Sequence, residues 1–422
     1  MNVRAPTIGF AGLSHLGLIS TVAAAEKGFS VVGYDNDSKK IKALMRAITN
    51  IVEPNLQSLL EKNKKSIHFT DNAEELKFCD LVYCSVDVPT SDQAISDLAP
   101  VNTILNTITK NITADAALVV LSQVPPGFTR SIRVDCCDVF YQVETLVFGN
   151  AISRAIDPER IILGCADPNA PIHPVLAIFL NSFECPVLPM RYESAELTKI
   201  AINCYLAADI TITNTLAEVC QKIGGDWEEV IPPLKLDRRI GSFAYLNPGL
   251  GISGGNLERD LETVISLGKS SDINVECIRS INNYSHYCKN WLMRSIKNEI
   301  LQESVQKVCI LGLSYKENTD SVKNSPAIEM IKQLEKCTIN AYDPSVPLDM
   351  DLAVCRKKTI IEAVEGADVL VVSTPWPEFK SINLLQIKKV MHGLKILDPY
   401  RMLNMKQAKT LGFEYRTIGV FT

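Results

Sequence analysis

Two polar side chains, Lys199 and Asn203, are spaced so that they could act on the same atom. They lie four residues apart in a segment with a helical pattern, and residues at this spacing share one face of a helix. An ammonium group and a carboxamide on one face can both donate hydrogen bonds to a single oxygen. Pairs of this kind are also common on solvated helix surfaces, so an ordinary surface role is the alternative.

A second set of residues has the types and the order of a dinucleotide site. Gly12 and Gly17 stand between a short apolar run and a helical pattern, and Asp35 ends the next apolar run, 23 residues after Gly12. In the order strand, glycine turn, helix, strand, acid, the helix N-terminus binds a pyrophosphate and the acid binds the ribose 2′-hydroxyl. An acid there repels a 2′-phosphate, so we expect NAD rather than NADP. Ser14 replaces the second glycine, which is expected to weaken or shift the cofactor; the predicted contacts are Gly12, Ser14, Leu16, Gly17 and Asp35.

Apolar runs continue to alternate with helical patterns beyond this first unit. Buried strands are expected at residues 81–86 and 117–122, and strands that alternate with helices indicate an α/β fold with a doubly wound parallel sheet. Ligands of such sheets bind beyond the carboxyl ends of the strands. Val86 and Ser122 are therefore expected to contact the cofactor.

A similar pattern recurs near the C-terminus. A buried run at residues 308–313 begins a second strand, glycine and helix unit, and residues 192–221 are expected to form one long helix before it. The pattern predicts two Rossmann-like doubly wound parallel-sheet domains joined by a central helical domain. The expected boundaries are residues 1–190, 191–300 and 301–422.

Composition excludes several classes of protein. The chain has 422 residues, a net charge of −5 and a pI near 5.7, which argues against a nucleic-acid binder. Apart from an uncharged run at residues 7–25, no stretch approaches about 18 uncharged apolar residues, so no membrane span is expected. Thirteen cysteines without metal-binding spacing predict buried, reduced thiols in a cytoplasmic protein and no metal site. An uncharged run at residues 7–25 leaves a signal peptide as the competing interpretation, although its glycines fit the nucleotide-binding unit.

Ordered motifs along nearly the whole chain resemble the UDP-glucose/GDP-mannose dehydrogenase family. The loop at residues 248–260 resembles the family's G-(F/Y)-G-G-x-C-x-P-K-D, and residues 195–203 resemble its A-E-x-x-K-x-x-x-N helix. Other matching segments are 12–18, 53–56, 122–127, 143–151, 157–161, 237–241, 310–316, 318–327, 341–344 and 374–379. The resemblance implies an NAD-dependent oxidoreductase of polysaccharide biosynthesis that acts on a nucleotide sugar, UDP-glucose by default, and that forms a homodimer through its central helices.

The resemblance also implies catalytic roles. Lys199 and Asn203 would stabilise developing oxyanions, and Asp260 would help Lys199 to activate a water. Glu144 would act as an acid–base group near the sugar or position water. The alternatives are a loop salt bridge for Glu144 and, for Asp260, an N-cap of a helix beginning near Leu261.

Binding roles are implied by the same resemblance. Arg239 would reach the nucleotide across the dimer interface, because a guanidinium fork suits phosphate or uracil oxygens. Lys316 lies in the second glycine turn, where a cation would meet phosphate. Lys323 takes the place of an arginine and is expected at the cofactor. The implied substrate contacts are Leu146, Lys199, Asn203, Arg239, Tyr245, Asn247, Gly251 and Lys316.

One position departs from the family pattern in a way that changes the chemistry. Asn256 takes the place of the cysteine that forms the family's covalent intermediate, and an amide is not a nucleophile at neutral pH. Gln123 and Glu258 also differ from the pattern, which favours natural divergence over an engineered change. Three interpretations stay open: a dehydrogenase limited to one hydride transfer or working without a covalent step, an epimerase that returns the hydride, and a non-catalytic binding protein. The first is favoured by the retained acid–base set, Lys199, Asn203, Glu144 and Asp260.

Overall fold

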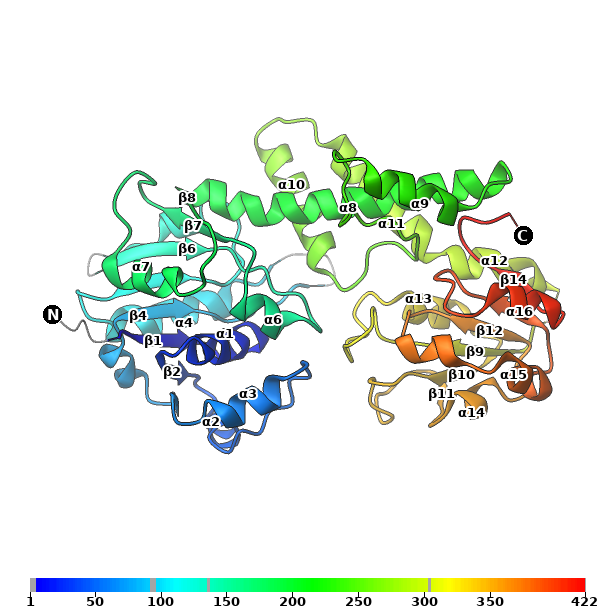
Figure 1. The fold of residues 1–422 in the computed structure, drawn as a ribbon, viewed down its shortest axis with the longest axis horizontal. Coiled ribbons are helices and arrows are strands. Elements are labelled where there is room, and N and C mark those ends of the chain that lie inside the picture. Colours follow the sequence, from blue (N-terminus) through cyan, green and yellow to red (C-terminus); the bar gives the residue numbers. More distant parts are fainter. Residues whose placement is uncertain (1–4, 92–95, 135–136, 303–304, 422) are drawn as a thin grey trace. The chain divides into compact units, whose positions relative to one another are not determined.

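The chain folds into two compact units, Met1–Ile202 and Asn203–Thr422, each with its own sheet and its own hydrophobic core (Figure 1). The computed structural model describes residues 5–91, 96–134, 137–302 and 305–421. Both sheets are built mainly from parallel strands with helices between them, and helices connect the two sheets along the chain. The predicted α/β class with two Rossmann-like sheets and a helical central region is therefore confirmed.

The first unit contains an eight-stranded sheet. Its strands are β1 Thr7–Ala11, β2 Ser30–Tyr34, β3 Ile67–Thr70, β4 Leu81–Cys84, β5 Ala117–Val120, β6 Asp138–Gln142, β7 Ile161–Cys165 and β8 Val187–Arg191. The order across the sheet is β3-β2-β1-β4-β5-β6-β7-β8, and every neighbouring pair is parallel except β6 with β7. Because the strand order reverses direction at β1 and β4, the crevice beyond their carboxyl ends is the expected ligand site.

Helices cover both faces of this first sheet, which explains why its strands are apolar at nearly every position. Leu81 and Tyr83 of β4 belong to one core layer, and the alternate residues Val82 and Cys84 belong to the other. The helices are α1 His15–Glu26, α2 Ser38–Leu44, α3 Leu56–Lys62, α4 Ala99–Asn111, α5 Phe128–Ser131, α6 Ala151–Ile156 and α7 Pro174–Asn181, with the 3-10 helix η1 Ala73–Phe78.

One long helix, α8, runs over Tyr192–Lys222, one residue beyond the helix predicted at residues 192–221. It begins in the first unit and ends in the second. The helices between α8 and the second sheet are α9 Trp227–Leu236, α10 Asn256–Ser270, α11 Glu276–Lys289 and α12 Trp291–Leu301. None of the helices in the described segments has the length and hydropathy needed to cross a membrane.

The second unit contains a six-stranded sheet in which all neighbouring pairs are parallel. Its strands are β9 Lys307–Leu311, β10 Thr338–Tyr342, β11 Cys355–Arg356, β12 Val369–Val372, β13 Lys395–Leu397 and β14 Glu414–Arg416, in the order β11-β10-β9-β12-β13-β14. The remaining helices are α13 Pro326–Gln333, α14 Ile360–Val364, α15 Leu384–Val390 and α16 Met405–Thr410, with the 3-10 helix η2 Pro377–Ser381.

The second sheet corrects one detail of the sequence interpretation. The helix expected directly after the second glycine turn, at Gly312, begins only with α13 at Pro326. The intervening residues form turns and loops, with Asn318 in the left-handed region at φ +60°. The strand and the glycine turn are therefore present, but the next helix does not follow them directly in the sequence.

Candidate functional site

The first glycine turn requires its two glycines for steric reasons. Gly12 has φ +94°, and a Cβ atom there would lie 2.8 Å from the Cβ of Val86. A Cβ atom on Gly17 would lie only 1.8 Å from the carbonyl oxygen of Gly12. Gly12 thus allows the turn and the loop above it, and Gly17 allows helix α1 to start directly against that turn.

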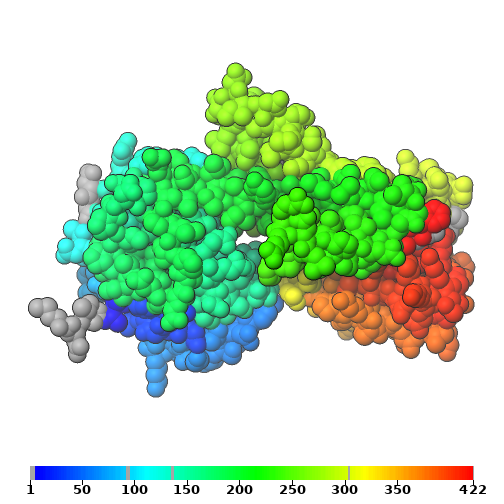
Figure 2. All heavy atoms as spheres, turned by 45° about the horizontal axis from the view of Figure 1, so that its top comes forward, coloured from blue at the N-terminus to red at the C-terminus, as the bar shows by residue number. Residues whose placement is uncertain are grey.

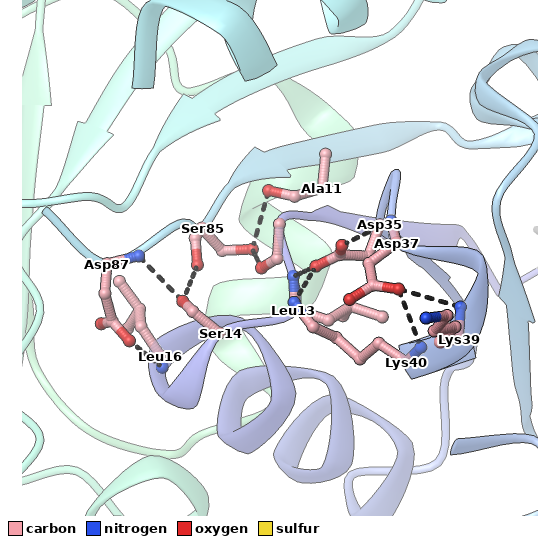
Figure 3. A network of polar contacts seen from close by, with 11 residues as sticks. Ala11, Leu13, Ser14, Leu16, Asp35, Asp37, Lys39, Lys40, Ser85 and Asp87 are labelled. Carbon is pink, nitrogen blue, oxygen red and sulfur yellow. Dashed lines mark hydrogen bonds and ion pairs between the residues drawn. The ribbon is translucent and has the colours of Figure 1, made fainter. Parts of the chain in front are cut away.

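Asp35 lies beside this turn, as predicted for the ribose-binding acid. Its buried carboxylate accepts hydrogen bonds from the backbone N–H of Leu13 at 2.9 Å and from the ammonium of Lys40 at 2.7 Å (Figure 3). Asp37 caps helix α2 by accepting from the N–H groups of Lys39 and Lys40, so the first turn of α2 brings Lys40 to Asp35. Sequence reasoning missed Lys40; its position just inside the next helix was the available signal.

The loop after β4 is fixed over the glycine turn by hydroxyl groups. Ser85 donates to the carbonyls of Ala11 and Gly12 at 3.2 and 3.1 Å, and Ser122 donates to the carbonyl of Val86 at 2.6 Å. The predicted contacts Val86 and Ser122 are thus brought together at the carboxyl ends of β4 and β5. Ser85 was not singled out as a contact from the sequence, although it comes directly after the strand.

The residues of this crevice fit a dinucleotide. The Ser14 side chain makes no capping hydrogen bond to helix α1, so the helix N-terminus depends on other groups to satisfy its first N–H groups. Gly12 and Gly17 form a cradle that any side chain would fill. An anion at this N-terminus would be stabilised by the N–H groups and the helix dipole, and Asp35 with Lys40 would meet the ribose.

A buried acid–base pair lies at the end of β6. The ammonium of Lys199, on α8, is 3.3 Å from the carboxylate of Glu144, and both side chains are mostly buried. Glu144 also accepts a hydrogen bond from the backbone N–H of Leu146. The salt bridge that was the alternative role for Glu144 is therefore present, and its partner is the lysine that the sequence placed in the same site.

A small cavity borders Glu144. Its volume is 60 Å³, and its lining includes Tyr83, Gln142, Glu144 and Leu146. The hydroxyl of Tyr83 donates to the side-chain oxygen of Gln142 at 2.9 Å. The cavity is large enough for ordered water and has polar groups to hold it, but it is too small for a sugar ring.

Asn203 and Asp260 meet in the second unit. The side-chain amide of Asn203 donates to Asp260 at 2.5 Å, and the guanidinium of Arg259 donates to the other carboxylate oxygen at 3.1 Å. Asp260 is 1% exposed. Since α10 begins at Asn256 with Gly255 as its N-cap, Asp260 lies in the second turn, and the interpretation of Asp260 as an N-cap is wrong.

The loop before α10 packs closely against residues 315–324 of the same unit. Gly254 has φ +93°, and a Cβ atom there would lie 2.6 Å from the ring of Tyr315. A Cβ atom on Gly255 would lie 3.3 Å from the side chain of Lys323. Lys323 is therefore next to the loop that carries Asn256, and Asn256 itself is exposed at the start of the helix.

Glu258, which replaces the family's proline, makes a buried network that sequence reasoning did not foresee. Its carboxylate accepts from the ammonium of Lys289 at 2.5 Å and from the side-chain amide of Asn324. Both Glu258 and Lys289 are buried. Breaking such a pair by removing one partner would leave an uncompensated buried charge.

The remaining predicted substrate contacts are dispersed over the second unit. Arg239 is exposed and pairs with Asp237 at 2.6 Å, and Tyr245 and Asn247 are also exposed. Gly251 has φ +79° and would collide with the carbonyl of Ser285 if it carried a side chain. Lys316 lies 5.9 Å from the ring centre of Tyr315. Within the described residues, no group of His, Cys, Asp and Glu side chains could hold a metal ion.

The first sheet, its glycine turn and the acid beside it define a dinucleotide-binding α/β protein. Three domain models of the UDP-glucose/GDP-mannose dehydrogenase family match the chain: the NAD-binding domain at residues 6–179, the central domain at 193–286 and the UDP-binding domain at 309–405. The chain belongs to this family of NAD-dependent nucleotide-sugar dehydrogenases, and its cofactor is NAD.

Curated and solved relatives agree with this family. UDP-glucose 6-dehydrogenase TuaD of Bacillus subtilis is 27% identical over 98% of this chain and 93% of its own length. UDP-glucose 6-dehydrogenase of Rickettsia bellii is 29% identical over 98% of this chain and 99% of its own. The structure of a UDP-glucose dehydrogenase from Pyrobaculum islandicum, 23% identical, superposes with a TM-score of 0.84 over 99% of this chain and 97% of that one, which shows the shared fold.

Proposed function

We propose that the chain oxidises a UDP-glucose-like nucleotide sugar with NAD and stops after one hydride transfer. The observation that carries this proposal is Asn256, an exposed amide at the start of α10 where the family has its nucleophilic cysteine. The retained pair Lys199 and Glu144 supports the oxidising half of the reaction. An aldehyde formed without a thiolate nearby is not trapped, so a second oxidation has no covalent intermediate to start from.

In this proposed step, some residues of the first unit would bind NAD and others would move the proton. The contacts Gly12, Ser14, Leu16, Gly17, Asp35, Val86 and Ser122 would hold NAD, which accepts the hydride. The Lys199–Glu144 pair would take the proton of the reacting hydroxyl and stabilise the developing alkoxide, because a buried ammonium next to a carboxylate can pass a proton between them. Water held in the cavity beside Glu144 would offer a route for that proton. Leu146 would line the sugar position.

Residues of the second unit are proposed for binding and charge stabilisation. Asn203, Asp260 and Lys323 would assist at the reacting end of the substrate and the nicotinamide, and Lys316, Gly251, Tyr245 and Asn247 would contact the nucleotide sugar. We propose the boundaries 1–190, 191–300 and 301–422 for the NAD-binding, helical and UDP-binding domains. Free thiols at all twelve described cysteines support a cytoplasmic location.

A homodimer is proposed from the surface of the central helices. The second half of α8 exposes Ile212, Leu216 and Val219, which share one face by their spacing, and the exposed Ile223 follows directly after the helix. In Figure 2 the green side chains of this half of α8 and of α9 form a continuous stretch of surface. An exposed apolar stripe of this kind marks an interaction site, and Arg239 would reach the partner's nucleotide from it.

A non-catalytic binding protein is the second candidate. The carboxylate of Asp260 is buried and bound by Asn203 and Arg259, an arrangement that favours a structural role. An epimerase that oxidises transiently and returns the hydride is the third, and would differ by forming no net NADH.

The test is the amount of NADH formed per sugar consumed, with NAD, UDP-glucose and a panel of other UDP- and GDP-sugars, and with products identified by mass spectrometry. We expect one NADH and an aldehyde from the natural chain, and two NADH and a carboxylate from Asn256→Cys. Asn298→Cys, which adds an exposed thiol on α12, is the matched control and should behave as the natural chain. Two NADH from the natural chain would contradict the proposal, a changed sugar without NADH would indicate the epimerase, and binding without turnover would indicate the non-catalytic protein.

A further inference from the structure

A carboxylate already faces the N-terminus of α1, where the family's cofactor needs to place its pyrophosphate. Asp87, in the loop after β4, accepts a hydrogen bond of 3.4 Å from the backbone N–H of Leu16 (Figure 3). Its own backbone N–H donates to the hydroxyl of Ser14 at 2.8 Å. Ser14 takes the place of the family's second glycine. The residue that departs from the family pattern is therefore in direct contact with Asp87.

The Asp87 backbone is held in this position from several sides. The hydroxyl of Ser14 is 3.5 Å from the carbonyl oxygen of Ser85, and Ser85 is itself bonded to the glycine turn. Ser122 binds the carbonyl of Val86. The loop can lie this close to the turn because Gly12 has no side chain. The position of Asp87 is therefore set by the same residues that form the cofactor crevice.

The charges around Asp87 make a second anion there unfavourable. Asp87 is an exposed residue, and its pKa is raised mainly by partial loss of hydration where its carboxyl lies against the N-terminus of α1, with a further contribution from the Glu144 carboxylate. His15 and the hydrogen bonds from Ser14 and Leu16 act in the opposite direction. The Nε2 atom of His15 is 2.9 Å from a carboxylate oxygen of Glu53. A pyrophosphate would thus enter a region that holds the carboxylates of Asp87, Glu53 and Glu144, of which Glu53 is paired with His15 and Glu144 with Lys199.

We propose that Asp87, positioned by Ser14, is an internal competitor of the cofactor pyrophosphate and sets the affinity of this chain for NAD. The carboxylate uses an N–H group of the α1 N-terminus that the pyrophosphate needs, and it must turn away before NAD binds. The apparent affinity is then reduced by the fraction of molecules in which Asp87 blocks the site. The proposal rests on NAD binding by the first unit and does not depend on turnover or on the substrate.

The test compares NAD affinities by isothermal titration calorimetry of the full chain. Asp87→Asn keeps the shape of the side chain and removes its charge, and we expect its Kd for NAD to fall at least about fivefold, the effect of one nearby like charge. Asp115→Asn, an exposed carboxylate before β5, is the matched control and should change the Kd less than about twofold. An Asp87→Asn protein that binds NAD no better than the control, or that binds no NAD at all, would overturn the proposal.

A second measurement separates charge competition from a general change of the crevice. ADP-ribose carries the pyrophosphate and adenosine does not, so Asp87→Asn should tighten ADP-ribose binding and leave adenosine binding unchanged. An equal gain for both ligands would contradict the proposal. Asp87→Gly is the second variant, with the fold of both checked by circular dichroism, and it should show the same selective gain because the competitor is removed entirely.

Discussion

The two glycine turns of this chain have the same sequence but different surroundings. Both read Gly-Leu-Ser, at residues 12–14 and 312–314, and their glycines have φ +94° and +91°. In each, the leucine N–H donates to an aspartate at the end of the next strand, Asp35 or Asp343. The first turns of the two Rossmann-like units are therefore built alike, and their different ligands must depend on what surrounds them.

The first difference lies in the chain immediately after each turn. Helix α1 begins at His15, one residue after the first turn, and places its N-terminus beside the crevice. After the second turn the chain remains non-helical until Pro326. Only the first turn is therefore followed directly in the sequence by a helix N-terminus, whose dipole and N–H groups suit a pyrophosphate.

The two acids differ in how fully the protein uses them. Asp35 accepts from two backbone N–H groups and from Lys40. Asp343 accepts from the backbone N–H groups of four residues, from a serine hydroxyl and from an indole, and the donors belong to Leu313, Ser314, Ser345, Val346 and Trp376. An acid with this many protein donors is a structural centre and has no capacity left for a ribose. The glycine motif alone therefore does not identify a dinucleotide site; the following helix and the state of the acid do.

The largest expected effect comes from adding a side chain at the second glycine of the first turn. Gly17→Ala places a Cβ atom 1.8 Å from the carbonyl of Gly12, and relieving this overlap must move α1 away from β1, at a cost on the order of 3 kcal/mol. We expect NAD affinity, measured by calorimetry, to fall by at least about a hundredfold. Glu317, at the same spacing after Gly312, is the matched position, and Glu317→Ala should leave the Kd within about twofold. Near-normal NAD binding by Gly17→Ala would show that α1 does not need this close approach.

Replacing each of the two aspartates by asparagine is the next test. Asp343→Asn turns an amide NH2 toward the N–H donors, so we expect the free energy of unfolding, measured with denaturant, to fall by about 2–3 kcal/mol with NAD affinity unchanged. Asp35→Asn should cost about 1 kcal/mol of stability and weaken NAD about tenfold, because the ribose loses its acceptor. Asp351→Asn, at an exposed position of the second unit, controls for the loss of charge. If both variants were equally destabilised and bound NAD equally, the distinction between the acids would be wrong.

The sequence predicted the first turn well because its requirements are steric. Only glycine suits the positive φ at position 12 and the close contact of position 17 with the Gly12 carbonyl. The spacing of these two glycines therefore predicts the turn. The same spacing argument was wrong about a helix after Gly312. There the residue at the second position is Glu317, and Asn318 turns the chain at φ +60°. The missing second glycine was the signal that no helix follows that turn directly in the sequence.

Polar loop residues were harder to foresee for a different reason. Lys40 and Asp87 take their positions from hydrogen bonds to other segments, Asp35 for the one and Leu16 with Ser14 for the other. Nothing in local spacing shows which loop carboxylate will face a helix N-terminus. Asp260 was misplaced as an N-cap because Gly255, with φ +107°, starts α10 earlier than the apolar pattern suggests.

Changing the serine of each turn tests the comparison at smaller scale. Ser14→Gly removes the hydroxyl that accepts from the Asp87 N–H and restores the family's glycine, so we expect NAD to bind about threefold more tightly. Ser314→Gly removes a hydroxyl that donates to Asp343 and should lower the free energy of unfolding by about 1 kcal/mol without changing NAD affinity. Calorimetry and denaturant unfolding on both variants give the two readouts. Weaker NAD binding by Ser14→Gly would mean that the serine supports the cofactor.

The smallest expected effect is a pH dependence confined to the first unit. The loop after β4 carries Asp87, whereas the matching residue after β12 is Pro375, so only the first crevice holds a titrating competitor. Because the pKa of Asp87 is raised above its ordinary value, the folded protein retains this proton to a higher pH than the unfolded chain. Its contribution to stability is therefore present at low pH and lost as pH rises through the folded pKa.

The affinity for NAD should depend on pH in the same direction as stability does, and be higher at low pH. As pH falls, protonated Asp87 no longer repels the pyrophosphate, and NAD should bind up to about threefold more tightly at pH 5 than at pH 8. In Asp87→Asn this part of the dependence should vanish. Calorimetric Kd values for NAD at four pH values, in both proteins and in Asp115→Asn, show how much of the pH dependence belongs to Asp87. Parallel profiles in all three proteins would show that Asp87 does not titrate against the cofactor, and the Ser14 contact would then act only by shape.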